Sequence, residues 1–312
     1  MTATLFDALL ALLLVWLGWR TVVSTNLFNA VVLFVIFGLL MVLCWARLGA
    51  PDVALAEAAI GAGLTAALLL EAYRDLTGND PHHVHDVEDS PLRWPLAALC
   101  GLLFLGLVAT GWQLAPPTEL GETVHARVAE SGVENPVTAV LLNFRGYDTL
   151  LEVAVLMLAL LGVWATNGPH ATLGSRQTLD PDSALIDAMV RLLVPMAALV
   201  CSYLLWAGAH APGGAFQAGA VLAGAGVLLH LAERLQPLGT ASTSSRALVT
   251  VGLFVFVAVA CYPLVYGGRL LAYPDGQTKA LIFLVEAALT VSIAHSLTLM
   301  FSGGRAFQRG RR

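Results

Sequence analysis

Long apolar stretches separated by short polar segments dominate this sequence. Nine of them reach or approach the roughly 20 residues that an α-helix needs to cross the hydrocarbon core of a bilayer. None shows the alternation over about ten positions that is typical of a transmembrane barrel strand. The pattern predicts an all-α polytopic membrane protein with about nine transmembrane helices, at residues 5–23, 27–47, 51–73, 93–113, 147–166, 189–208, 213–231, 247–266 and 279–301.

The composition points to the same class. Of the 312 residues, 58% are hydrophobic and 12% are charged, and the mean hydropathy is +0.78. An average soluble domain is about 25% charged, so a soluble chain of this composition would expose far too much apolar surface. This excludes a soluble enzyme, a nucleic-acid-binding protein and a disordered protein.

The basic residues predict an orientation. Nine spans place the termini on opposite sides, and Lys and Arg are enriched in cytoplasmic loops. With a cytoplasmic C-terminus, that side holds eleven of the 16 basic residues, four of them in residues 305–312. We therefore predict an outside N-terminus and a cytoplasmic C-terminus in the cell's inner (cytoplasmic) membrane.

Three polar segments divide the chain, at residues 77–90, 116–143 and 167–183. Their Gly, Pro and Asp residues end helices and favour turns. The predicted modules are residues 1–90 with three spans, 91–170 with two and 171–312 with four.

An ionisable group near the middle of a membrane costs roughly 2.5–3.5 kcal/mol, so each one needs a reason. Pro51 suits a first helical position, and Asp52 next to it can cap the helix or pair with Arg47. Glu57 lies about 9 Å further along, with Gly61 on the same helix face. These small neighbours leave room for another helix or for water beside the carboxylate, so Glu57 is a candidate ion-path residue.

A second acidic group lies at the mouth of the fifth predicted span. Arg145, Asp148 and Glu152 are spaced three and four residues apart and so share a helix face. Two carboxylates beside a cation suit the mouth of a proton or cation path. The alternative is an interfacial salt bridge that anchors the helix end.

The connection between the sixth and seventh spans contains Pro212, Gly213 and Gly214, which prevent a continuous helix. Non-helical backbone between two apolar spans must be buried in protein or line a wet cavity, so we expect it to be packed. His210 can change charge near neutral pH or serve only as a hydrogen-bonding residue.

Glu286 lies inside the last span, nine residues before His295. Nine residues turn a helix by about 900°, which leaves the two side chains on opposite faces. We expect each to meet a different neighbour. The tract at residues 81–86 (PHHVHD) is interpreted as a solvated loop, because it lacks a second ligand cluster. We predict no metal site and no cofactor.

Three segments carry a family resemblance. Residues 26–63, with LGAPDVALAEAAIGAG at their centre, resemble the MbhD-type domain (DUF4040), and residues 139–152 (AVLLNFRGYDTLLE) resemble the MbhE-type domain. The last module, with GAHAPGGAFQAGAVLA, is similar to the MnhB family. Such domains belong to multisubunit Mrp-type Na⁺/H⁺ antiporters, membrane-bound hydrogenases and other relatives of respiratory complex I. In the Mrp family the MnhB domain is usually a separate chain, whereas here all three are fused.

The resemblance implies a non-enzymatic membrane subunit of an Mrp-type cation (Na⁺)/proton antiporter. Its implied partners are other membrane subunits, the lipid bilayer, and Na⁺ and H⁺ as transported ions, with no nucleic acid. The family's acidic positions fall on Glu57 and Glu152, while Asp148, His210 and Glu286 complete the candidate ion path. The family's signature falls on His210, Pro212, Gly213, Gly214, Phe216 and Gln217, with Ala215 where a third glycine is common.

Two alternatives remain open. The same modules occur in redox-driven complexes such as membrane-bound hydrogenases. No residue of this chain distinguishes such a complex from an Mrp-type antiporter. The chain can also be a non-conducting scaffold whose carboxylates form structural ion pairs. A solitary carrier is the weakest reading, because no pair of inverted repeats builds a central site.

The predicted topology can be tested with two tags. A tag at the C-terminus should react only from the cytoplasmic side, and a tag within residues 116–135 only from the outside, because of the distribution of basic residues. Accessibility to an impermeant thiol reagent in intact cells and in everted vesicles measures both. Labelling of both tags from the same side contradicts the nine-span prediction.

Overall fold

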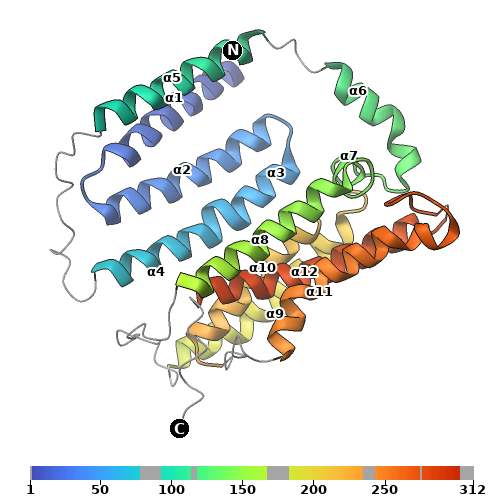
Figure 1. The fold of residues 1–312 in the computed structure, drawn as a ribbon. Coiled ribbons are helices and arrows are strands. Elements are labelled where there is room, and N and C mark those ends of the chain that lie inside the picture. Colours follow the sequence, from blue (N-terminus) through green and yellow to red (C-terminus); the bar gives the residue numbers. More distant parts are fainter. Residues whose placement is uncertain are drawn as a thin grey trace.

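The computed structural model describes residues 2–77, 93–113, 118–166, 183–234, 243–274 and 276–302. The histidine tract at 81–86 and the basic tail at 305–312 lie outside these ranges. Every regular element within them is a helix (Figure 1), which confirms the all-α fold class. The elements are α1 (Thr2–Val23), α2 (Leu27–Arg47), α3 (Pro51–Ala56), η1 (Glu57–Leu64), α4 (Thr65–Thr77), α5 (Arg93–Gln113), α6 (Thr118–Arg127), η2 (Val128–Ser131), α7 (Pro136–Ala139), η3 (Val140–Phe144), α8 (Gly146–Thr166), α9 (Ala184–Ala207), α10 (Ala215–Leu231), α11 (Thr243–Cys261), η4 (Tyr262–Tyr266) and α12 (Thr278–Phe301).

Within the described ranges, seven helices are long and apolar enough to cross a membrane. They correspond to predicted spans one to three, five, six, eight and nine. The fourth and seventh predicted spans match shorter apolar helices, Ala97–Trp112 and Ala215–Leu231, so the number nine stays a prediction. Large apolar side chains such as Leu102 and Leu199 are exposed on the outer helices, as a chain surrounded by lipid requires.

Helix α12 is the centre of the bundle. Over its apolar window 56% of the residues are buried, against 33% or less for the other six long helices. It packs against α8, α9, α10, α11 and α4, and Figure 1 shows α8, α10 and α11 gathered around it. Helices α1 and α2 pack on each other, and α2 packs on η1, so the N-terminal helices form a second layer.

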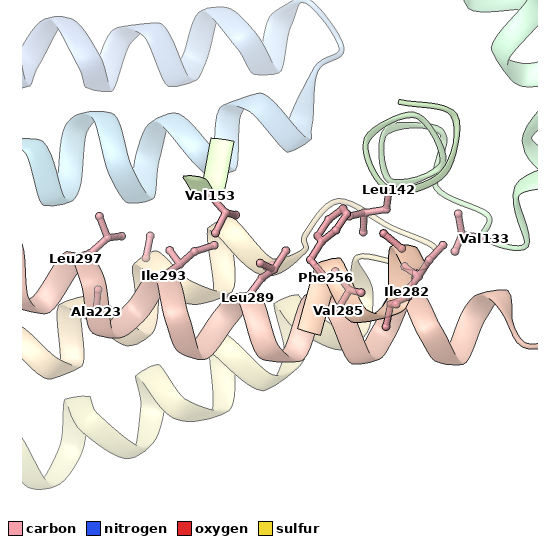
Figure 2. Close-up of a cluster of buried hydrophobic side chains, with 14 of the residues drawn as sticks. Val133, Leu142, Val153, Ala223, Phe256, Ile282, Val285, Leu289, Ile293 and Leu297 are labelled. Atoms are coloured by element: carbon pink, nitrogen blue, oxygen red, sulfur yellow. The ribbon is translucent and has the colours of Figure 1, made fainter. Parts of the chain in front are cut away.

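The core follows one face of α12. Leu289, Ile293 and Leu297 lie four residues apart, the spacing of one helix face, and each is nearly or fully buried. Figure 2 shows this row meeting Val153 of α8 and Phe256 of α11. Burial of such side chains contributes about 1.5–3 kcal/mol each, so α12 holds the C-terminal helices together.

Small residues let α10 and α11 approach α12 closely. A Cβ atom on Gly219 would lie 2.8 Å from Cγ2 of Ile293, and one on Gly252 would lie 2.8 Å from Cβ of Ser292. Helices in membranes associate largely through such close packing, because lipid is as apolar as the side chains. The Gly- and Ala-rich sequence of α10 is therefore a packing surface.

One sequence-based interpretation needs correction. The sequence predicts the third span as one regular helix, but a π-helical segment, η1, interrupts it between α3 and α4. The polar segment at residues 116–143 contains α6, η2, α7 and most of η3. Asn135 caps α7 by accepting a hydrogen bond from the Val137 N–H (2.9 Å), and Pro136 follows at the first helical position, which is a normal helix start.

The packing of α10 on α12 predicts different effects of two glycine substitutions. Gly219→Ala should destabilise the protein by about 1–3 kcal/mol, because the new methyl group overlaps Ile293. Gly224→Ala, on the same helix, should be neutral or stabilising, since nothing lies within 4 Å of the position that its methyl group would take. The apparent melting temperature of detergent-extracted protein measures both. Equal melting temperatures for the two variants would contradict the close approach.

Candidate functional site

A cavity of about 300 Å³ lies where the N-terminal, middle and C-terminal helices meet. Its walls come from α3 and η1, from α7, η3 and α8, and from the start of α10 and the middle of α12. The lining residues are Asp52, Val53, Ala56, Ile60, Val137, Thr138, Leu141, Leu142, Thr149, Glu152, Gly213, Gly214, Ala215, Phe216, Gln217, Glu286 and Leu289.

The polar lining is acidic. Asp52, Glu152 and Glu286 contribute three carboxyl groups, and none of these lining residues from the described ranges is basic. Asp52 and Glu286 are buried, with 8% and 3% of their surface exposed, whereas Glu152 is exposed. The cavity is therefore lined by two buried carboxyl groups and by a third that is exposed at the protein surface.

Glu286 points from α12 towards the non-helical connection between α9 and α10. A Cβ atom on Gly208 or Gly214 would lie 3.2 or 3.1 Å from its Oε1 atom, so these glycines leave space for the carboxyl group. The backbone N–H of Ala215, at the start of α10, forms a hydrogen bond to that group. Within the described ranges, its buried Oε2 atom has no hydrogen-bond partner. The positive end of the α10 dipole thus favours negative charge at Glu286.

The connection at residues 208–214 is packed against protein at Gly208, Gly213 and Gly214, which are buried, whereas His210 and Pro212 are exposed. Gly214 has φ +117°, which L side chains rarely adopt, and a Cβ atom on Gly213 would overlap the Leu204 carbonyl oxygen. The Ala209 carbonyl oxygen accepts hydrogen bonds from the backbone N–H groups of Glu134 and Asn135. Ala215 is accommodated as the first residue of α10, so the missing third glycine leaves the turn intact.

Asp52 ties this connection to α3. Its Oδ1 atom accepts hydrogen bonds from the Gly213 N–H (3.1 Å) and from Nδ2 of Asn135 (3.4 Å). In return, Nε2 of Gln217 donates to the Asp52 carbonyl oxygen (3.2 Å). Asp52 therefore reaches across to α10 and does not pair with Arg47. That arginine instead binds Asp7 of α1 through two hydrogen bonds of 2.8 and 2.9 Å.

The acidic group at the start of α8 divides between two environments. Arg145 and Asp148 form an ion pair of 2.7 Å at the helix end, and neither lines the cavity. Glu152, one turn further along, does line it. The structure thus places a partly exposed ion pair and the cavity carboxylate on the same helix, one turn apart.

A break in the backbone between η3 and α8 forms one wall of the cavity. At Arg145 the backbone leaves the helical region, with φ −130° and ψ 39°. The carbonyl oxygens of Leu141 and Leu142 accept hydrogen bonds from the side-chain hydroxyls of Thr149 (2.7 Å) and Tyr273 (2.8 Å). Burial raises the pKa of Tyr273 to about 12, so the phenol keeps its proton and remains a donor at neutral pH.

Glu57 lies outside this cavity. It is half-buried at the start of η1, and its carboxylate folds over Gly61, where a Cβ atom would overlap Oε1. Gly38 of α2 lies on its other side. The small residue therefore makes room for the carboxylate, as the sequence indicated, but the neighbouring Ala56 faces the cavity. A role of Glu57 in an ion path stays a prediction.

His210 and His295 also lie away from the lining. His210 is exposed, and its ring meets Trp206 edge-on at a centroid distance of 4.5 Å. His295 is within 2.9 Å of the Ser245 hydroxyl on α11. Glu286 faces the 208–214 connection instead, which confirms that Glu286 and His295 meet different neighbours.

Sequence reasoning missed three polar residues around the cavity: Asn135, Thr138 and Thr149. Thr138 donates its hydroxyl to the Gly208 carbonyl oxygen, and Asn135 donates to the Ala211 carbonyl oxygen (2.9 Å). The sequence Asn135–Pro136 was a usable signal, because Asn followed by Pro is typical of a helix start. Nothing in the local sequence marked Thr149.

Comparison with known proteins assigns two parts of the chain. Residues 12–77 match the MbhD family, which is described as a subunit of MBH, and residues 185–304 match a domain related to the MnhB subunit of Na⁺/H⁺ antiporter. The chain therefore carries an MbhD domain and, after it, a domain related to MnhB, fused in one membrane protein. This confirms the resemblance to Mrp-type subunits for its first and last modules. The MbhE-like middle segment and the module boundaries stay predictions.

Two solved structures share the fold of this fused chain. A chain of the Mrp complex from Dietzia sp. DQ12-45-1b aligns with a TM-score of 0.74 and 23% identity, over 97% of this chain and 35% of that one. A chain of the membrane-bound sulfane sulfur reductase, an archaeal respiratory membrane complex, aligns with a TM-score of 0.54 and 27% identity, over 68% of this chain and 98% of that one. The fused chain thus spans about a third of the Dietzia chain. No curated protein matches the sequence.

The hydrogen bonds of Asp52 predict different effects of two substitutions. Asp52→Ala should cost about 1–3 kcal/mol, because it leaves the buried Gly213 N–H without an acceptor. Asp52→Asn should retain most of the stability, since its side-chain oxygen can accept the same bonds. Thermal unfolding and yield of the extracted protein measure both. An Asn variant as damaged as the Ala variant would show that the charge matters and not the acceptor.

Proposed function

We propose that the fused MbhD–MnhB chain is an ion-translocating membrane subunit of a multisubunit Mrp-type cation (Na⁺)/proton antiporter in the cytoplasmic membrane. Other membrane subunits of that assembly are its partners, and it performs no covalent chemistry. The two family matches and the fold shared with the Dietzia Mrp chain support this proposal. In this proposal, the transported ions pass through the cavity between the modules and bind there.

The observation that carries the proposal is a cavity lined by three carboxyl groups and, among the residues that the structure describes, by no basic side chain. Negative charges that share a low-dielectric space repel one another strongly, so they must bind protons or a cation. The two ligands then compete for the same oxygen atoms. Such competition is what coupled exchange of a cation against protons requires.

The three carboxyl groups differ in burial and in hydrogen bonding, so we assign them different roles in ion exchange. Glu286 is the deep site, since it is nearly fully buried and one of its oxygen atoms has no hydrogen-bond partner among the described residues. Glu152 is the outer site, because it lines the cavity and is exposed. Asp52 is committed to Gly213 and Asn135 and chiefly holds the wall in place.

The remaining candidates extend the path beyond the cavity. Glu57 borders the same helical segment as the lining residues Ala56 and Ile60, but on the side of α2. Asp148 lies near the start of α8, where its negative charge can attract cations, and His210 follows the end of α9, where its ring can exchange protons. Their contribution should be smaller than that of Glu286.

A second kind of assembly, a redox-driven membrane complex, is also compatible with the fold. The archaeal respiratory relative is matched over 98% of its chain, which favours a redox-driven complex as the alternative assembly. The same cavity would serve either one. The mass of the intact detergent-extracted complex distinguishes them, because co-purifying iron–sulfur or NiFe subunits indicate the redox-driven form.

Neutral substitutions at the carboxyl groups test the ion path. With the chain produced in its whole complex, Glu286→Gln should reduce Na⁺-driven proton exchange at least about tenfold, because it removes the exchangeable charge while keeping the volume. Glu152→Gln and Glu57→Gln should reduce exchange less. A pH-sensitive dye in everted vesicles reports exchange, and immunoblots report subunit levels.

Glu122→Gln is the matched control. Glu122 is exposed on α6 and does not line the cavity, so exchange should stay at the wild-type rate. If Glu286→Gln, Glu152→Gln and Glu57→Gln all assemble and all exchange ions at that rate, the chain is a scaffold and the proposed ion path is wrong.

A further inference from the structure

The cavity is much larger than a small cation needs. Its volume is about 300 Å³, whereas a water molecule occupies only about 30 Å³ in the liquid. This volume is at the lower end of the range found for pockets that bind small organic molecules. The volume of the cavity is therefore large enough for a ligand that carries an apolar group.

The walls of the cavity are chiefly apolar. Ile60, Leu142, Phe216 and Leu289 come from four different segments and face the same space. Leu142 and Leu289 also belong to the buried cluster of Figure 2, so this part of the wall is anchored in the core. Walls of this kind are typical of small-molecule sites, in which a few polar groups fix the orientation of the ligand.

One polar atom in the cavity lacks a partner. Oε2 of Glu286 is buried in a side chain that is 3% exposed, and within the described ranges nothing donates a hydrogen bond to it. An unpaired buried acceptor costs about 1–3 kcal/mol, and a charged one costs more. A ligand that donates an N–H to this atom would recover that free energy.

We infer that the cavity binds an amphiphilic organic ammonium ion, whose charged nitrogen donates to Glu286 and whose apolar group contacts Ile60, Phe216 and Leu289. The inference rests on the proposed function in one respect, since both need Glu286 to accept positive charge. Bound there, the organic cation occupies the space of the transported cation. It therefore acts as a competitive ligand of the ion path.

Other ligand chemistries fit less well. An anion would be repelled by three carboxyl groups without a basic residue among the lining. A neutral apolar molecule, such as a lipid chain, fills the volume but leaves Oε2 of Glu286 unpaired. A neutral alcohol can donate to Oε2 but brings no positive charge to the carboxyl groups, so a cationic donor with an apolar group fits the cavity best.

Two probes of nearly equal shape separate these cases. 2-Phenylethylammonium carries a positive charge on its N–H donors, whereas 2-phenylethanol has the same apolar group and only a neutral O–H donor. Isothermal titration calorimetry on the purified, detergent-solubilised complex at low Na⁺ should show saturable binding of the ammonium ion. The alcohol should bind about tenfold to a hundredfold more weakly, because it lacks the charged hydrogen bond.

Variants then assign the binding to this cavity. Glu286→Gln should weaken binding of the ammonium ion about tenfold or more, while Glu122→Gln on α6 should leave it unchanged. Ala56→Leu, which narrows the cavity without touching a carboxyl group, should weaken the binding of both probes. It supplies the test if the Glu286 variant does not assemble.

The outcomes distinguish this inference from the proposed function. Equal affinity for the two probes, or wild-type affinity in both Glu286→Gln and Ala56→Leu, would overturn the organic-cation site, whatever happens to ion exchange. Loss of ammonium binding in Glu286→Gln together with wild-type exchange would support the site and count against the ion path. Loss of exchange with unchanged ammonium binding would do the reverse.

Discussion

Backbone polar groups away from water must find partners within the protein, and this requirement shapes the whole region around the cavity. In lipid, each unpaired N–H or C=O group costs several kcal/mol. The connection at residues 208–214 lies beside Glu286, about 12 Å along α12 from its first residue at 1.5 Å per residue. It is tolerated there because Asp52, Asn135 and Leu204 supply its hydrogen bonds.

The same requirement explains how the break at the start of α8 persists. Interrupting the helix there leaves the Leu141 and Leu142 carbonyl oxygens facing side chains, and the hydroxyls of Thr149 and Tyr273 pair with them. The non-helical segments thus meet in one place, each satisfied by its neighbours. A cavity forms between them because satisfied loops pack less closely than helices whose small residues interdigitate, as α10 and α12 do around Gly219.

Hydropathy alone was enough to find the seven long apolar helices of the described ranges, because a membrane helix has to be apolar over its whole length. Pro212, Gly213 and Gly214 also indicated a packed connection, for the reason given above, and the two glycines are buried while Pro212 is exposed. Hydropathy could not predict which carboxyl groups line the same cavity. Glu152 and Glu286 are far apart in the sequence, and no local periodicity relates them. The π-helical segment η1, which begins at Glu57, also had no signal in the hydropathy pattern.

The bond between Asp52 and Gly213 crosses from the MbhD domain to the MnhB domain. Where these domains belong to separate polypeptides, the same contact forms only after two proteins meet in the membrane. On one chain it is intramolecular, so its effective concentration is set by the tether and not by expression levels. Fusion therefore fixes the ratio of the two domains at one to one, and a complete cavity no longer depends on balanced synthesis of two proteins.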